Sequence, residues 1–432
     1  MNDPGDDPGS GAVSADETRT SGGILGRRLS ALAAPLLVAV AVQSVGNLLY
    51  HAVVGRALPA DQYGALGAVL AAMTLVAVPL SALQTAAART TAAHGLTAAT
   101  ARKAMLTTAL GCAPFVVAVA VAAPVIQSYL HLDNLWDALI LAPTLLVASV
   151  IAIARGLLLG AGRTTMVAGS YLVAVAVRLG PGLLLAMVYG VTGALVGTLL
   201  GEIAGLLVVL IPGLRSGRGL AEPVPLRDIV RTGVVVAGLF TFTTVDLFLA
   251  RHFLLGAESG GYVAAATIGK TVLALPAAAL SVAYPRLVAG YPLPGRFASL
   301  RSALLVVGVP AVAGAAVVAA LPTLVLTVLY GSEAFPGAAP VVSVLALVAG
   351  LSAFVSVFAH AGLARRSWTA FIPWAGAVLE IGLIEWRHDS AVQVAIGSAI
   401  ALAVTLVVMA VVEGAAWRSS PAETQAAAQS TE

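Results

Sequence analysis

Residues 73–89 read MTLVAVPLSALQTAAAR, and residues 270–286, in the second half of the chain, read KTVLALPAAALSVAYPR. Seven of the 17 aligned positions are identical. Matches of Ala and Leu arise easily in an apolar sequence, so the informative identities are those of Thr, Pro and Arg. They pair Thr74 with Thr271, Pro79 with Pro276, and Arg89 with Arg286. We interpret this recurrence as the trace of a duplicated half.

The duplication extends upstream of the quoted segment. Asn47 precedes Tyr63 by 16 residues, and Asp246 precedes Tyr262 by the same 16. In a membrane protein, an internal repeat of this kind is typical of transporters.

The composition indicates a membrane protein. Hydrophobic residues make up 59% of the 432 residues and charged residues only 10%, whereas soluble domains carry about 25% charged residues. The alternation of period two that a membrane barrel requires is absent. Instead, apolar runs of about 20 residues, each sufficient to cross the hydrocarbon core as a helix, recur throughout. They are residues 30–53, 64–87, 104–124, 135–157, 165–188, 191–213, 229–253, 262–284, 299–321, 338–361, 368–385 and 392–414. We therefore predict an all-α polytopic protein with about twelve transmembrane helices.

The distribution of basic residues predicts the orientation. They fall in the N-terminal tail, in every second loop (Arg155 and Arg163 among them) and in the C-terminal tail, whereas the other loops hold only Arg56, Arg251 and Arg387. By the positive-inside rule both termini are cytoplasmic. The net charge of +3 is thus a topology signal and predicts no nucleic-acid partner. Two Lys against 21 Arg, with abundant Ala and Gly, suggest a GC-rich bacterial genome and hence the plasma (inner) membrane.

The spans divide into two six-helix bundles, residues 25–213 and 228–414, joined by a cytoplasmic linker at 214–227. The polar segments 1–24 and 415–432 are expected to be disordered tails. Because six is even, both bundles run in the same direction, so a pseudo-twofold axis along the membrane normal would relate them. Substrate sites in such proteins lie near the midplane between the repeats.

Pro79 and Pro276 each fall in the middle of the second span of their half. A proline there normally kinks a membrane helix. The two residues are either packing bends or hinges for opening and closing.

The segment 55–90 resembles the start of polysaccharide or oligosaccharide flippases, which belong to the superfamily of multidrug and toxin extruders and lipid II flippases. The family pattern is a first helix ending near Gly-Arg, a loop closing with Tyr-Gly, and a second helix ending in an Ala-rich stretch with Arg. These positions are Gly55-Arg56, Tyr63-Gly64 and Arg89, and the second half opens with a matching run of Asp246, Gly261-Tyr262, Lys270 and Pro276. The resemblance implies two bundles flanking a central cavity that alternates between membrane faces. It also implies transfer of lipid-linked sugars from the cytoplasmic to the outer leaflet.

Four ionisable residues lie deep in the predicted spans, where charges are costly and often functional. Arg178 and Glu202 are each 12 residues from residue 190, the middle of the turn between their spans. Asp246 and Lys270 are each 12 residues from the middle of theirs. Two residues that are equally far in sequence from the turn between antiparallel helices are expected to lie at the same depth in the membrane. We therefore expect two ion pairs, Arg178–Glu202 and Asp246–Lys270, either as a cavity lining or as pins between helices.

Polar residues follow the same faces. Thr243 is one turn before Asp246, and Thr267 and Thr271 flank Lys270 at helical spacing. Gln43, Asn47 and His51 make a third stripe at i, i+4 and i+8. We interpret these stripes as walls of a substrate cavity, although single Gln or Asn side chains also serve as contacts between helices. His360 and Glu380 lie nearer span ends, where interfacial solvation is a sufficient explanation.

The predicted function is transport of a lipid-linked oligosaccharide or a related polysaccharide precursor through the bilayer. Lys270 and Arg178 are the expected partners of an anionic headgroup, since pyrophosphate requires cations or amide donors. H⁺ or Na⁺ is a plausible coupling ion, with Asp246 or Glu202 as the titrating group.

Two other functions stay open. A cation-coupled drug extruder of the same superfamily would use membrane carboxylates such as Asp246 and Glu202. An integral-membrane glycosyltransferase or polymer ligase is less favoured, because the predicted external loops are short. The sequence has no G-x-x-x-x-G-K-[ST] loop, no H-x-x-x-H pair and a single Cys112, so we expect no ATPase, no metal site and no cofactor.

Overall fold

The computed structural model describes residues 14–214, 226–273 and 296–418, with a few isolated positions between 273 and 296. The linker 214–227 and the tails 1–24 and 415–432 therefore lie largely outside the described residues. The helix α1 (Ser14–Ala57) begins within the segment expected to be a disordered tail. Once an apolar span has nucleated a helix, adding further residues costs little, which explains how α1 extends beyond its apolar part.

The first half consists of helices joined by short turns. After α1 come α2 (Ala60–His94), α3 (Ala98–Tyr129), α4 (Leu135–Leu139), α5 (Leu141–Gly160), α6 (Thr164–Leu179) and α7 (Pro181–Leu214). The fifth predicted span, 165–188, is broken, because α6 ends just before Pro181, which has no N–H to donate to the preceding turn. The chain reverses at Gly190 within α7, where φ is 59°, a value that glycine adopts without strain.

The second half repeats this construction. Its helices are α8 (Leu226–Phe242), α9 (Val245–Phe253), α10 (Ala257–Val272), α12 (Arg296–Ala320), α13 (Pro322–Tyr330), α14 (Ala339–Ala364), the short 3₁₀ helix η1 (Trp368–Phe371), α15 (Ile372–Trp386) and α16 (Ala391–Arg418). The predicted span 229–253 is interrupted between α8 and α9, at Thr243 and Thr244.

Within the described ranges, ten helical segments are long and apolar enough to cross a membrane. They coincide with ten of the twelve predicted spans. Of the other two, 165–188 is divided between α6 and the start of α7, and 262–284 begins with α10 and runs beyond the described residues. The expectation of an all-α polytopic membrane protein is confirmed.

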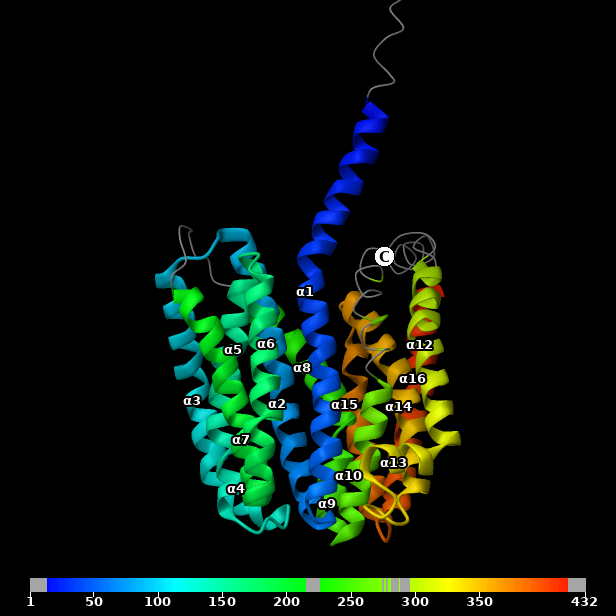
Figure 1. The fold of residues 1–432 in the computed structure, drawn as a ribbon. Coiled ribbons are helices and arrows are strands. Elements are labelled where there is room, and N and C mark those ends of the chain that lie inside the picture. The colour runs from blue at the N-terminus through cyan, green and yellow to red at the C-terminus, as the bar shows by residue number, and fades with distance from the viewer. Residues whose placement is uncertain are drawn as a thin grey trace, which may run out of the picture.

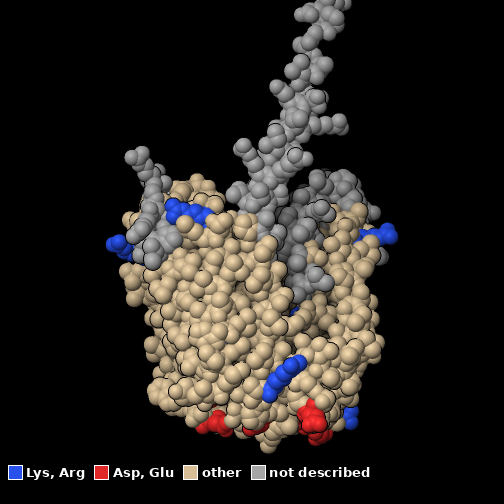
Figure 2. All heavy atoms as spheres, viewed as in Figure 1, with Lys and Arg blue, Asp and Glu red and all other residues tan. Residues whose placement is uncertain are grey.

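Figure 1 shows the helices of the two halves as neighbouring groups, with α1 standing between them and projecting beyond the body. We call the end from which α1 projects the basic end, because α2 and α14 finish there beside Arg89 and Arg366. The other end, where α1, α9 and α13 finish, is the far end. Figure 2 shows Asp and Glu of the visible face only at the far end, whereas Lys and Arg lie at the basic end and also near the far end.

The buried apolar residues explain why the halves separate toward one end. One core, which includes Tyr50, Tyr63, Leu195, Tyr262 and Tyr330, is shared by both halves near the far end. Toward the basic end it is replaced by two separate cores, one within each half. The halves are therefore joined at the far end and divided at the basic end, which leaves room for a cavity between them.

The two prolines do not decide between a bend and a hinge. α2 runs as one helix through position 79, and α10 ends at Val272, four residues before the buried Pro276. Arg286 lies outside the described residues. A hinge role for Pro79 and Pro276 stays a prediction.

Candidate functional site

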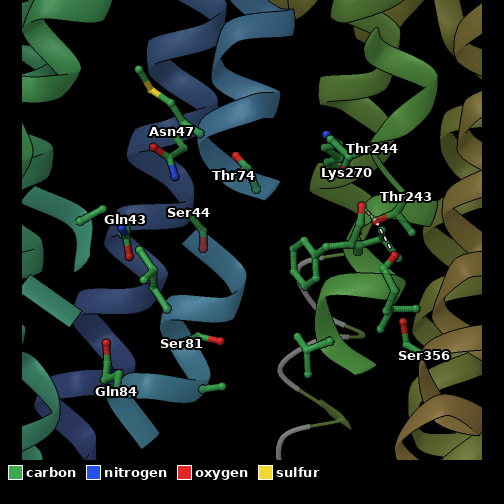
Figure 3. Close-up of a pocket in the computed structure, with 18 of the residues that line it drawn as sticks. Gln43, Ser44, Asn47, Thr74, Ser81, Gln84, Thr243, Thr244, Lys270 and Ser356 are labelled. Carbon is green, nitrogen blue, oxygen red and sulfur yellow. Dashed lines mark hydrogen bonds between the residues drawn. The ribbon is translucent and has the colours of Figure 1, made fainter. Parts of the chain in front are cut away.

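A cavity of about 1930 Å³ lies between the two halves. It extends from His51 and Val263, beside the shared core, to His94 and Arg366 at the basic end. Figure 3 shows two facing walls with polar side chains. The first-half wall carries Gln43, Ser44 and Asn47 from α1 and Thr74, Ser81 and Gln84 from α2, and the second-half wall carries Thr243, Thr244, Lys270 and Ser356.

Most of the side chains expected to line a cavity do so. Those on the wall of the large cavity are Gln43, Asn47, His51, Arg178, Glu202, Thr243, Thr267, Lys270 and Thr271. Asp246 lies behind this surface, on a separate small pocket. The three predicted polar stripes therefore face the same cavity.

The expected direct ion pair between Arg178 and Glu202 is wrong. Among the residues that the structure describes, Arg178 instead donates from Nη1 to Asn47 Oδ1 at 2.9 Å, and its guanidinium lies 4.0 Å from the centre of the Tyr50 ring. The reversal at Gly190 gives the two residues similar depth, as the residue count predicts, but α6 packs against α1 and turns Arg178 toward it. Equal depth therefore does not imply a shared helix face.

The direct pair Asp246–Lys270 is also absent from the described part of the chain. Asp246 Oδ2 instead accepts a hydrogen bond from Tyr262 Oη at 2.8 Å. The turn between α9 and α10 is centred near residue 255 rather than 258. Tyr262 therefore matches Asp246 in depth, whereas Lys270 lies about two turns deeper. Lys270 lines both the large cavity and the small pocket that holds Asp246, and no described carboxylate lies within salt-bridge distance of it.

Asp246 shares its small pocket, of about 30 Å³, with Glu380 of α15. That is about the space that one water molecule occupies. Glu380 is 1% exposed, and Glu380 Oε2 and Asp246 Oδ1 are both buried without a hydrogen-bond partner. Interfacial solvation, which the sequence suggested for Glu380, is therefore wrong. The residue is six positions from the end of α15 and Asp246 is seven from the end of α9, so these counts would have predicted a similar depth but not the contact.

The large cavity has a strong charge imbalance. Its described lining holds five basic side chains and one carboxylate, that of Glu202; the basic residues are Arg89, Arg155, Arg178, Lys270 and Arg366. Sequence reasoning placed Arg155 in a loop. In the structure it is a buried residue of α5, five positions before the end of that helix. The cavity is therefore suited to a negatively charged group.

The far end is held closed by two arginines, each of which donates to backbone carbonyls of the other half. Arg56 of α1 donates to Val328 O at 2.6 Å and to Leu329 O at 2.9 Å, in α13. Arg251 of α9 donates to Leu130 O at 2.8 Å, His131 O at 2.7 Å and Asp61 O at 3.2 Å, in the first half, and to Ser259 Oγ at 3.0 Å in its own half. We call these two sets of bonds the arginine clamps. The sequence indicated only that both residues lie near the ends of their spans.

Between the clamps, three aromatic side chains connect the halves at the inner end of the cavity. Tyr63 Oη lies 3.0 Å from His51 Nδ1 and 3.2 Å from Tyr330 Oη of the second half. Phe335 packs against both tyrosine rings. A substrate in the cavity is therefore separated from the far end by packed aromatic rings and the arginine clamps.

No family model matches the sequence, and no curated protein matches it. Solved structures share its fold. The lipid II flippase MurJ in an inward closed conformation has a TM-score of 0.70 at 12% identity, over 90% of this chain and 88% of the flippase. An inward-facing multidrug resistance MATE transporter of the MOP superfamily has a TM-score of 0.63 at 15% identity, over 86% of this chain and 95% of the transporter. A MOP superfamily transporter from Pyrococcus furiosus has a TM-score of 0.63 at 16% identity, over 89% of this chain and 94% of that protein.

These likenesses extend over nearly the whole length of each chain, so they concern the complete arrangement of helices and not a single bundle. They also include both a flippase and extruders, as the resemblance of the segment 55–90 implied. The protein therefore has the fold shared by the lipid II flippase MurJ and the MATE transporters of the MOP superfamily.

Proposed function

We propose that the protein is a transporter that moves an anionic, lipid-linked oligosaccharide or a related polysaccharide precursor across the bacterial plasma membrane by alternating access. The observation that carries this proposal is the charge of the cavity, five basic side chains against one carboxylate. A phosphate or pyrophosphate group attached to a lipid carrier supplies the matching negative charge. The basic end would face the cytoplasm, as the positive-inside rule requires. No enzymatic step is proposed.

Arg178 and Lys270 would hold the phosphate group at the inner end of the cavity. Arg178 lies beside Asn47 on the first-half wall, and Figure 3 shows Lys270 on the opposite wall. Closing the basic end would bring these two cations together. At a separation of about 8 Å and an effective dielectric constant of 20, their repulsion is about 2 kcal/mol. An anion between them converts this repulsion into attraction, so the loaded protein would close more readily than the empty one.

Asp246 and Glu380 are our candidates for binding the coupling ion, H⁺ or Na⁺. Two carboxylates that share a small pocket, each with a buried unpartnered oxygen, are stabilised by a proton or a cation between them. Glu202, the other residue considered for this role, faces the large cavity. Lys270 lines both the small pocket and the large cavity, so the ion site and the substrate site would be adjacent.

The alternative is a cation-coupled multidrug extruder, because the MATE transporters have the same fold. An organic cation would face a lining with a large excess of positive charge, which disfavours this function.

The test compares the two substrate classes in proteoliposomes. A lipid-linked oligosaccharide pyrophosphate with a fluorescent label should cross the bilayer, whereas a cationic dye should not be extruded. Arg178→Gln and Lys270→Gln should each reduce flipping at least about tenfold, the loss expected for one charge-assisted contact. Arg102→Gln is the matched control, since Arg102 is exposed on α3 outside the cavity. Extrusion of the dye without flipping of the lipid would reject the proposal in favour of the extruder.

A further inference from the structure

Arg155 is a buried cation that lacks a counter-charge. It is 7% exposed, on α5, and lines the large cavity. Its Nε donates to Ser170 Oγ at 3.0 Å, and its guanidinium lies 3.9 Å from the centre of the Tyr171 ring. Ser170 Oγ donates in turn to Gly205 O at 2.8 Å. A neutral hydroxyl and an aromatic face therefore fix the guanidinium in place, and no described carboxylate pairs with it.

Most of the hydrogen-bonding capacity of Arg155 is unused. A guanidinium has five N–H donors, and the described residues accept only the one on Nε. Nη2 is buried without any partner. Burying a charged donor without an acceptor is unfavourable, so this arrangement calls for an acceptor that is not part of the chain.

Two other arginines show that the fold can supply several acceptors or a counter-charge to such groups. Arg251 donates to four oxygen atoms at the far end. Arg365 pairs with the buried carboxylate of Glu413, to which its Nη2 donates at 3.3 Å. Arg251 and Arg365 each connect their own helix to another part of the chain. Arg155 and Arg178, which line the cavity, have a different environment. Each donates to one neutral acceptor, lies over one tyrosine ring and keeps one buried nitrogen without a hydrogen-bond partner.

The two cavity arginines occupy different depths. Tyr171, which lies under Arg155, precedes Arg178 by seven residues on α6. At 1.5 Å of rise per residue, seven residues correspond to about 10 Å along the helix. Arg155 is thus nearer the basic end, and a single phosphate group cannot contact it and Arg178 through the same oxygen atoms.

We propose that Arg155, positioned by Ser170 and Tyr171, is a separate binding site for a phosphate group, which an incoming substrate occupies before it reaches Arg178 and Lys270. This inference rests on the proposed function and adds an entry site to it. Arginine suits the role because its planar fork of donors matches two phosphate oxygens. The phosphate could belong to a lipid headgroup or to a free anion.

The test measures binding to the purified full-length protein by calorimetry, with inorganic pyrophosphate and a short-chain polyprenyl pyrophosphate as separate probes. The variant Arg178→Gln/Lys270→Gln should lose transport but keep residual binding of at least one probe. Adding Arg155→Gln to it should weaken that binding further, by about tenfold or more. Residual binding of both probes assigns the site to phosphate itself, and binding of the lipid alone assigns it to a headgroup.

Arg89→Gln is the matched control, because it removes one positive charge from an exposed lining position near the basic end. If it weakens residual binding as much as Arg155→Gln does, the effect is general electrostatics and the inference is wrong. If Arg178→Gln/Lys270→Gln abolishes all binding, there is no separate entry site, although the proposed function stands.

A second measurement leaves Arg155 intact in case its substitution prevents folding. Phenylglyoxal modifies arginine side chains, and mass spectrometry gives the extent of modification at each position. Pyrophosphate should protect Arg155 in both the wild type and Arg178→Gln/Lys270→Gln, by about tenfold in rate when the site is saturated. Equal modification of Arg155 with and without the probe would overturn the inference.

Discussion

Arg251→Gln should open the far end. The substitution removes three hydrogen bonds from Arg251 to carbonyls of the first half, at 2.7 to 3.2 Å. The guanidinium is 7% exposed in the closed state and would be hydrated once the far end opens. Each bond therefore contributes only its net value, about 1 kcal/mol. The sum is about 3 kcal/mol, which corresponds to a factor of about 150 in the ratio of closed to open protein.

Labelling of an introduced cysteine measures this ratio. Thr267→Cys, in a Cys112→Ser background, places a thiol on the cavity wall behind the aromatic rings. A membrane-impermeant maleimide added from the far side reacts only with the open form. Its rate should rise about a hundredfold in Arg251→Gln, up to saturation when the open form predominates. Arg387→Gln is the control, because Arg387 is exposed just beyond α15 at the far end and takes no part in the clamps. Equal labelling rates in the two variants would refute the assignment of Arg251 as a clamp.

Three further predictions concern other parts of the structure. Asp246→Asn and Glu380→Gln should each abolish the dependence of flipping on the H⁺ or Na⁺ gradient in proteoliposomes. Pyrophosphate binding, measured by calorimetry, should change by no more than about twofold. Unchanged gradient dependence in both variants would contradict a coupling role. Glu413→Ala leaves the partly buried Arg365 without its partner and should cost about 1 to 3 kcal/mol of stability, visible as a lower melting temperature in differential scanning fluorimetry. Gly156→Ala places a Cβ 2.4 Å from Gln84 O of α2 and should destabilise the protein by about 1 to 3 kcal/mol, whereas Gly111→Ala, which meets nothing within 4 Å, should leave the melting temperature unchanged or slightly higher.

The spans and the cavity stripes could be predicted because they depend on local periodicity. Asn47 and His51 recur at helical spacing, and that spacing alone brings them to one wall of the cavity. The turn near residue 190 was also predictable, since Gly190 is where the chain reverses.

The partners of the charged residues could not be predicted in the same way. The depth of a residue follows from counting, but the direction of its side chain depends on which helices pack together. Arg178 meets Asn47 because α6 packs on α1, a contact between elements that are far apart in the sequence. Asp246 meets Tyr262 because the turn is centred about three residues earlier than assumed. Arg155 was missed because its position near a span end was interpreted as a loop.

The arginine clamps use acceptors that belong to the backbone, and this has a consequence for how the protein tolerates change. Substitution of Val328, Leu329, Leu130 or His131 alters a side chain but leaves the accepting carbonyl in place. The arginine clamps are thus sensitive to mutation at two codons, those of Arg56 and Arg251, while the side chains at the accepting positions can vary. Carbonyl oxygens also do not titrate in the physiological range, so the closure keeps its strength when acidity changes. The proposed ion-binding carboxylates, Asp246 and Glu380, lie behind the cavity wall and make none of the clamp bonds, so a change in their protonation would reach the far end only through the packing of the helices.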